Sequence, residues 1–167
     1  MKKRPILKLK NTVIEKIFNI VSLLILLSHF LYLIVNWGNI ANRIPAHFNL
    51  SGEINRWSDK TELLLLPILG LIFWVVLTIL EKYPHLYNYD DSKLSIENAK
   101  SYYINSRMCI NLLKNEVVII FSLINWNSIN ITFGNTNYLN YWSLTLICII
   151  LIITLLIFIF KGKKIKN

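Results

Sequence analysis

Charged side chains are scarce in this chain, and long stretches contain none. Only 16% of the 167 residues are Asp, Glu, Lys or Arg, whereas about a quarter is usual in a soluble domain. Hydrophobic residues make up 54% and come in unbroken blocks. This pattern excludes an ordinary soluble domain and predicts an integral membrane protein, with the lipid bilayer as its surroundings.

Cysteine and acidic residues are also few. Cys109 and Cys148 are far apart and lie in or beside apolar runs, which favours two small buried hydrophobic side chains over a disulfide. Nine acidic residues against 18 Lys and Arg leave a net charge of +9. A nucleic-acid-binding protein would place this charge on one folded face. Here it stands at the chain ends and between the apolar blocks, as in membrane topology signals, so no nucleic-acid partner is expected.

Four apolar stretches are long enough to cross a hydrocarbon core of about 30 Å at about 1.5 Å per helical residue. The predicted spans are residues 17–37, 62–81, 110–130 and 141–160. The first is too long for the apolar core of a signal peptide and is expected to remain uncleaved. Pro67 is expected to kink the second span, with neighbouring helices satisfying the carbonyl that it frees. Asp59 and Glu62 resemble a capping box at its start.

The spans form a predicted membrane domain, residues 17–160, between a basic head (1–16) and a basic tail (161–167). The loops that join the first three spans are residues 38–60 and 82–107. The head, the second loop with the start of the third span, and the tail hold fifteen Lys and Arg, against three in the first loop. The positive-inside rule therefore predicts cytoplasmic termini, a cytoplasmic loop 82–107 and an outer loop 38–60 in a bacterial plasma membrane.

Tryptophan positions agree with this orientation, since four of the five fall near predicted outer ends of spans: Trp37, Trp57, Trp126 and Trp142. Such aromatic belts mark membrane interfaces. The predicted fold class is an all-α integral membrane protein with four transmembrane helices and a structured extracytoplasmic loop between the first two.

A few polar residues fall within or beside the predicted spans. His29 is either a functional group or a neutral side chain bonded to a neighbouring helix; the second is favoured, because no acidic residue lies in the middle of a span. Lys114 and Glu116 are expected to extend to the inner interface. An asparagine cluster is expected to bond between helices or to lie at the outer interface: Asn125, Asn127 and Asn130.

Catalytic motifs are missing from the sequence. His47, Glu53 and Asp59 in the first loop match no metal-ligand spacing. The chain also has no nucleophile motif and no glycine-rich phosphate loop. We therefore expect no enzyme activity, no catalytic residue, no metal site and no cofactor.

The first loop has the features of a folded cap on the membrane domain. Ile44 precedes Pro45 and is held extended, Ser51 and Gly52 supply a turn, and Trp57 anchors the returning strand at the interface. His47 and Asn49 then either find partners inside the cap or bind a ligand.

A spaced pattern in this loop is followed by a Leu-rich span with Pro67. It consists of Ile44, Pro45, His47, Phe48, Asn49, Gly52, Glu53, Trp57 and Lys60. The pattern resembles the domain of unknown function 1648, which forms the N-terminal part of the SdpI-type immunity proteins of bacteria. A looser likeness extends the resemblance over about residues 18–130. Many members have an acidic residue where this chain has Asn55, and SdpI-type proteins have more spans after this domain.

The resemblance implies a non-enzymatic immunity protein that protects its cell against an envelope-acting peptide toxin. The residues that it implies for ligand binding are His47, Asn49, Gly52, Glu53, Trp57 and Lys60. The alternative is a membrane sensor that sequesters a soluble regulator at its cytoplasmic face, where the basic tail could also act as a plain topology anchor or hold anionic lipid.

Overall fold

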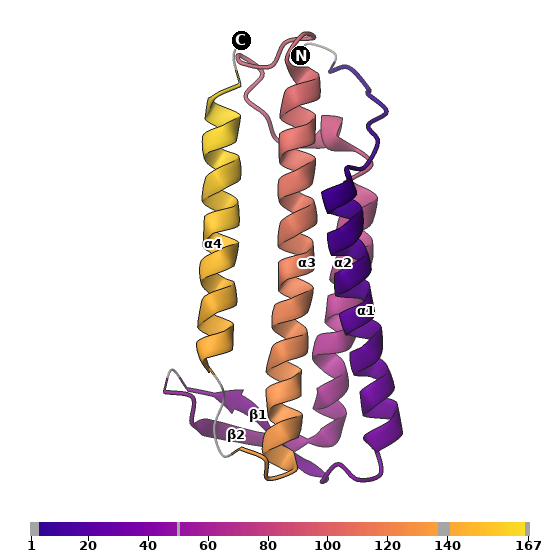
Figure 1. Cartoon of the computed structure of the whole chain (residues 1–167), viewed down its shortest axis with the longest axis vertical. Coiled ribbons are helices and arrows are strands. Elements are labelled where there is room, and N and C mark those ends of the chain that lie inside the picture. Colours follow the sequence, from indigo (N-terminus) through magenta and orange to yellow (C-terminus); the bar gives the residue numbers. More distant parts are fainter. Residues whose placement is uncertain (1–3, 50, 137–140, 166–167) are drawn as a thin grey trace.

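Four long helices run side by side in the computed structural model, which describes residues 4–49, 51–136 and 141–165 (Figure 1). They are α1 (Val13–Asn36), α2 (Leu65–Leu80), α3 (Ala99–Thr132) and α4 (Tyr141–Lys163). With the short 3₁₀ helix η1 (Lys60–Leu64) ahead of α2, four helices are long and apolar enough to cross a membrane. The predicted number of helices is confirmed, and the fold is consistent with a multi-pass membrane protein.

Some predicted features lie outside the described part of the chain. These are residues 1–3 of the basic head, residues 166–167 of the basic tail, and residues 137–140 ahead of the fourth predicted span. The limits of the membrane spans, and the side of the membrane on which each loop lies, stay predictions.

The helix α3 is the centre of the arrangement. It packs against α1, α2 and α4 (Figure 1). Both ends of the chain lie at one end of the bundle, and the loop between α1 and α2 lies at the other. With 34 residues, α3 is about 50 Å long, so it exceeds a hydrocarbon core of about 30 Å.

The loop between α1 and α2 forms an antiparallel hairpin of β1 (Arg43–Phe48) and β2 (Ile54–Asp59). The predicted all-α class omitted this sheet. A lone two-stranded hairpin is marginally stable in water, and here β1 packs on α3. Ile44 and Pro45 are buried at that contact, whereas β2 is largely exposed.

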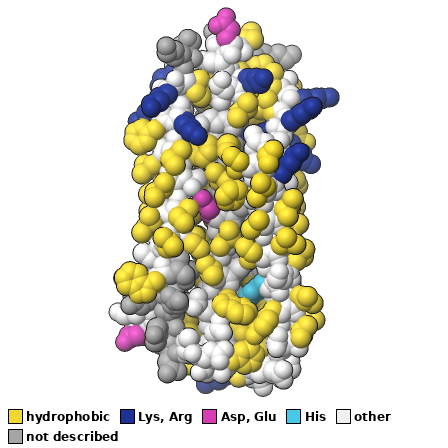
Figure 2. All heavy atoms as spheres, viewed as in Figure 1, with side chains coloured by type: hydrophobic (Ala, Val, Ile, Leu, Met, Phe, Trp, Pro, Cys, Tyr) yellow, Lys and Arg dark blue, Asp and Glu magenta, His cyan; other side chains and the backbone are white. Residues whose placement is uncertain are grey.

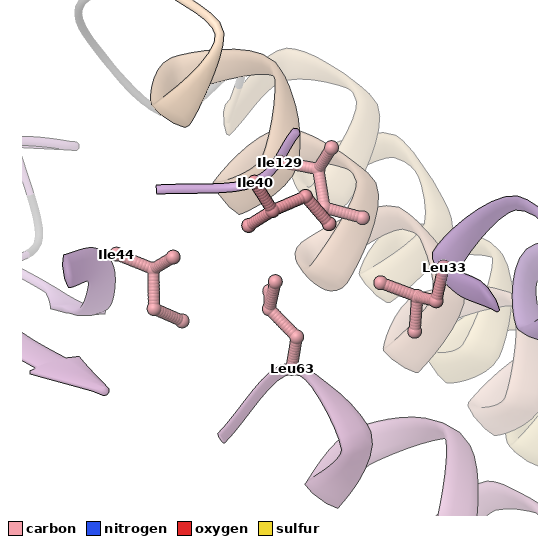
Figure 3. Close-up of a cluster of buried hydrophobic side chains, with 5 residues drawn as sticks. All are labelled: Leu33, Ile40, Ile44, Leu63 and Ile129. Atoms are coloured by element: carbon pink, nitrogen blue, oxygen red, sulfur yellow. The ribbon is translucent and has the colours of Figure 1, made fainter. Parts of the chain in front are cut away.

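The root of the hairpin is held by an apolar cluster. Its buried side chains converge from α1, the α1–β1 connection, β1, η1 and α3 (Figure 3); they are Leu33, Ile40, Ile44, Leu63 and Ile129. This contact joins segments that are distant in sequence.

The start of α2 differs from its predicted form. Asp59 caps η1 by accepting a hydrogen bond from the Thr61 N–H at 2.9 Å, but Glu62 turns to Arg56 instead of completing a capping box. Pro67 stands in the first turn of α2, directly after η1, and not inside a kinked helix. That position suits proline, because the first turn of a helix does not need its missing N–H.

Basic and apolar side chains gather on different parts of the outer surface. Figure 2 shows Lys and Arg gathered near the end of the molecule where both termini lie, beside a broad hydrophobic band. Both cysteines are free, and Cys148 is exposed on α4 instead of buried as expected. The reason is that α4 contacts only α3 closely, so most of its apolar side chains face outward.

Candidate functional site

The tip of the hairpin is built by three of the residues predicted to bind a ligand. The Asn49 side-chain oxygen accepts hydrogen bonds from the N–H groups of Ser51 (3.0 Å) and Glu53 (2.9 Å). Its amide nitrogen donates to the Glu53 carboxylate at 2.8 Å. Gly52 has a φ of 80°, which favours glycine. Asn49 and Gly52 thus shape the turn, and Asn49 finds its partners inside the cap.

His47 also has a partner inside the cap. Its Nδ1 lies 2.6 Å from the Asn55 side-chain oxygen, across a stretch of irregular register between β1 and β2. An amide oxygen only accepts hydrogen bonds, so the His47 Nδ1–H donates in this contact. His47 is exposed, which leaves its Nε2 at the surface.

The two remaining predicted residues differ in their surroundings. Trp57 lies opposite Pro45 in the ladder and is 49% exposed. The Lys60 ammonium donates to the Trp37 and Ile40 carbonyl oxygens at 3.1 and 3.4 Å and lies over the Trp37 ring. A cation at this position satisfies carbonyl groups at the C-terminal end of α1. Lys60 therefore fastens the hairpin to α1.

The other side of the hairpin root is fixed by charge. Arg56 forms two hydrogen bonds with the Glu62 carboxylate, at 3.0 and 2.9 Å, and Ser58 donates to the same group. Beside them, the N–H of Thr61 lowers the pKa of the Asp59 carboxyl by stabilising its charged form. The hairpin is thus attached at its root by several hydrogen bonds, with His47, Glu53 and Trp57 exposed on its surface.

A second group of polar residues, absent from the predicted site, lies inside the bundle. The Lys114 ammonium lies 2.7 Å from the Glu81 carboxylate, and both side chains are buried. Lys114 also donates to the Thr78 hydroxyl at 2.9 Å and lies over the Trp74 ring. The prediction that Lys114 reaches the inner interface is wrong, because Glu81 at the end of α2 offers an opposite charge inside the bundle.

Amides and a hydroxyl extend this ion pair toward α1. The Asn111 amide donates to Glu81 and to the Asn19 side-chain oxygen. Asn115 donates to the same Asn19 oxygen at 2.9 Å and accepts from Ser22. The network joins α1, α2 and α3 through hydrogen bonds that lipid cannot replace.

A second buried ion pair closes the end of the bundle nearest the termini. The Arg107 guanidinium binds Glu15 through two hydrogen bonds, at 2.9 and 3.0 Å. It also donates to the Leu9 and Lys10 carbonyl oxygens, which holds the segment before α1 against α3. A cavity of about 600 Å³ lies beside that segment, and Glu81 and Arg107 are among its lining residues.

The carboxylate of Glu116 on α3 has a hydrogen-bond partner on α4. The Thr154 hydroxyl donates to Glu116 at 2.7 Å, and both residues are buried. Glu116 therefore does not extend to the inner interface as predicted. Its position on α3 faces α4, so the neighbouring helix covers it.

His29 has the neighbouring-helix partner that the sequence favoured. Its Nε2 lies 2.8 Å from the Asn125 amide nitrogen, which also donates to the Leu63 carbonyl at 2.7 Å. In a continuous helix, that carbonyl would accept from residue 67, but Pro67 has no N–H. Asn125 thus donates to the Leu63 carbonyl from a neighbouring helix, although Pro67 stands in the first turn of α2 and does not kink the helix as predicted.

A spacing on α3 could have revealed the interior network. Six of its buried polar residues are each three, four or seven positions from another member of the set: Arg107, Asn111, Lys114, Asn115, Ser122 and Asn125. This is the spacing of one helical face. The sequence prediction counted Arg107 and Lys114 among the topology signals and expected Asn125 to bond between helices or to lie at the interface. Their partners on α1 and α2 are not evident without the packing.

The two buried ion pairs are satisfied, whereas one oxygen of the buried Glu116 carboxylate has no hydrogen-bond partner among the described residues. The ion pairs neutralise their own charge, and in the described ranges no three His, Cys, Asp or Glu side chains are placed to hold a metal ion. The hairpin instead presents an imidazole, a carboxylate and an indole at its surface. Such a surface is suited to binding.

Comparison with known proteins finds a family that part of the chain resembles. Residues 24–71 match the family described as domain of unknown function DUF1648, which confirms the predicted resemblance to that domain. The match runs from the middle of α1 through the hairpin into α2. An uncharacterized protein of Archaeoglobus fulgidus is 27% identical over 107 residues, covering 57% of this chain and 55% of that protein. No solved structure matches the chain.

The interior ion pair predicts a distinctive pattern of stability. Replacing Lys114 by Met leaves the Glu81 carboxylate buried without its cation, and should lower the free energy of unfolding by about 3–5 kcal/mol. The double replacement Lys114→Met with Glu81→Gln should recover much of this loss. Thermal unfolding of the purified protein in detergent measures both.

Lys82→Met provides the matched control, because Lys82 follows Glu81 in sequence but is exposed. It should change the free energy of unfolding by less than about 0.5 kcal/mol. Equal losses in Lys114→Met and Lys82→Met would contradict a structural ion pair.

Proposed function

We propose that this chain is a non-enzymatic bacterial membrane protein of the immunity type, which protects its own cell against an envelope-acting peptide toxin. The observation that carries the proposal is the rigid hairpin. Both sides of its root are fastened to the helices, while His47, Glu53 and Trp57 remain exposed. The resemblance to SdpI-type proteins supplies the class of function.

The orientation that we expect for the chain in the membrane supports this role. The Lys and Arg side chains gather at the bundle end with both termini (Figure 2), and the hairpin lies at the opposite end. The positive-inside rule then makes the termini cytoplasmic and the hairpin extracytoplasmic. Lys114 is buried and paired with Glu81, so it is not counted in this charge bias. The other Lys and Arg residues still place the excess of positive charge at the end with the termini. The hairpin would face a toxin that arrives from outside.

The binding surface consists of few groups. Trp57 is exposed to about half its extent, and an indole on a rigid strand provides a large contact area with little loss of conformational entropy. The His47 Nε2 accepts a hydrogen bond from a peptide N–H, and Glu53 provides negative charge for a basic peptide. Asn49, Gly52 and Lys60 contribute by maintaining the shape of the hairpin.

The protective role predicts loss of immunity when the exposed groups are removed. Cells whose chromosomal gene is replaced by the His47→Ala, Trp57→Ala double variant should become as sensitive to culture supernatant of the parent strain as cells without the gene. Survival counts measure this, with membrane levels checked by immunoblot.

Trp142→Ala is the matched control, because it removes another exposed tryptophan outside the hairpin. It should leave survival unchanged. Full survival of the double variant, or of cells without the gene, would refute the immunity role.

The proposed orientation has its own test. With Cys109 and Cys148 replaced by Ser, a cysteine placed at Ser51 in the hairpin turn should react with a membrane-impermeant maleimide in intact cells. A cysteine placed at Ser92, in the loop after α2, should react only after permeabilisation. Both serines are exposed, so accessibility within the fold does not decide the result. The reverse pattern would exclude an outer hairpin.

A second candidate is a sensor that sequesters a soluble regulator. One feature favours it: the loop after α2 is folded, because Arg4 donates to the Tyr87 carbonyl at 2.6 Å and pairs with Asp91 at 2.8 Å. An ordered loop at the proposed cytoplasmic end offers a defined surface. The sensor should co-purify with a soluble protein and lose it when residues 161–167 are deleted; purification of the intact chain alone would exclude this function.

A further inference from the structure

A groove between α1 and α3 has no role in the proposed function. Its volume is about 490 Å³, within the range of about 300–1,000 Å³ that is usual for ligand sites. The lining is largely apolar and includes Tyr32, Trp126, Ser28 and Ser122, with His29 among them. The Tyr32 and Trp126 rings are 4.9 Å apart across the two helices.

The hydrogen bonds around His29 determine where its proton is. The Asn125 amide nitrogen must face the Leu63 carbonyl, because that oxygen only accepts. The same nitrogen lies 2.8 Å from the His29 Nε2, so Nε2 must accept the second amide hydrogen. The imidazole is therefore neutral, with its proton on Nδ1.

This Nδ1–H group has no acceptor among the residues that the structure describes. The neighbouring hydroxyls do not change this, since Ser28 donates to the Leu24 carbonyl and Ser122 to the Val118 carbonyl, each within its own helix. An unpaired N–H in apolar surroundings is unfavourable by about 1–3 kcal/mol. His29 is therefore a fixed donor in an apolar groove.

We propose that this groove binds an acyl lipid of the surrounding bilayer, with an ester carbonyl oxygen accepting the hydrogen bond of the His29 Nδ1–H. An ester oxygen accepts without bringing a donor or a charge that the groove cannot satisfy. The acyl chain suits the apolar lining, and the groove is formed by two helices that are apolar enough to cross the membrane. Tyr and Trp side chains prefer the interfacial level, where the ester groups of lipids also lie.

The test compares two bilayers that differ only in the proposed acceptor. The full chain, labelled with ¹⁵N-histidine, is reconstituted in nanodiscs of ester-linked or ether-linked phosphatidylcholine with the same chains. The His29 ring signals, assigned by their absence in His29→Phe, should show a hydrogen-bonded Nδ1–H only in the ester lipid. If water or nothing occupies the groove, the His29 ring signals should be the same in both lipids. That result would overturn the proposal.

A second measurement locates the lipid. A photoactivatable ester phosphatidylcholine with a diazirine in its chain should label peptides from α1 and α3 around the groove. Ester lipid lacking the diazirine should compete about three- to tenfold better than the ether lipid, as expected for one hydrogen bond. Equal competition would refute the role of the carbonyl.

Two substitutions serve as a matched pair. Ser122→Phe places a ring in the groove while leaving His29 and Asn125 unchanged, and should abolish the labelling of the groove. Ile149→Phe adds a ring at an exposed position of α4 and should not alter it. Thermal unfolding identifies any variant that fails to fold, and undiminished labelling of folded Ser122→Phe would refute the site.

Discussion

The buried polar face of α3 is the constraint on which the rest of the structure depends. Hydrocarbon offers no hydrogen-bond partner, so the groups on this face must be satisfied by other helices. Lys114 meets Glu81 from α2, Asn111 and Asn115 meet Asn19 from α1, and the Thr154 hydroxyl on α4 reaches α3. Apolar packing permits many arrangements of four helices, whereas these pairs select one.

The same requirement connects the bundle to the hairpin. Pro67 frees the Leu63 carbonyl, and Asn125 on α3 satisfies it while orienting His29 on α1. The Leu63 side chain belongs to the apolar cluster under the hairpin. A proline, a buried amide and a docked hairpin root are therefore connected by direct contacts.

Much of the architecture was predictable because hydrophobic length is a local property. The four long apolar helices and the bond of His29 to a neighbouring helix were both anticipated. Lys114 and Glu116 were misplaced, since the sequence shows their charge but not the Glu81 and Thr154 side chains that meet them. The roles of Asn49 and Lys60 could not be predicted either. An asparagine that forms a turn and an asparagine that binds a ligand cannot be distinguished by residue type alone.

The sequence by itself determined a membrane class, four long apolar helices and a polar cap with a recognisable spacing, because these follow from composition and short-range periodicity. Only the tertiary structure decided which charges are paired, which side of the hairpin is covered and which His29 nitrogen carries the proton. Those properties depend on contacts between residues such as Lys114 and Glu81, or His29 and Asn125. Such contacts arise only when helices distant in sequence pack together.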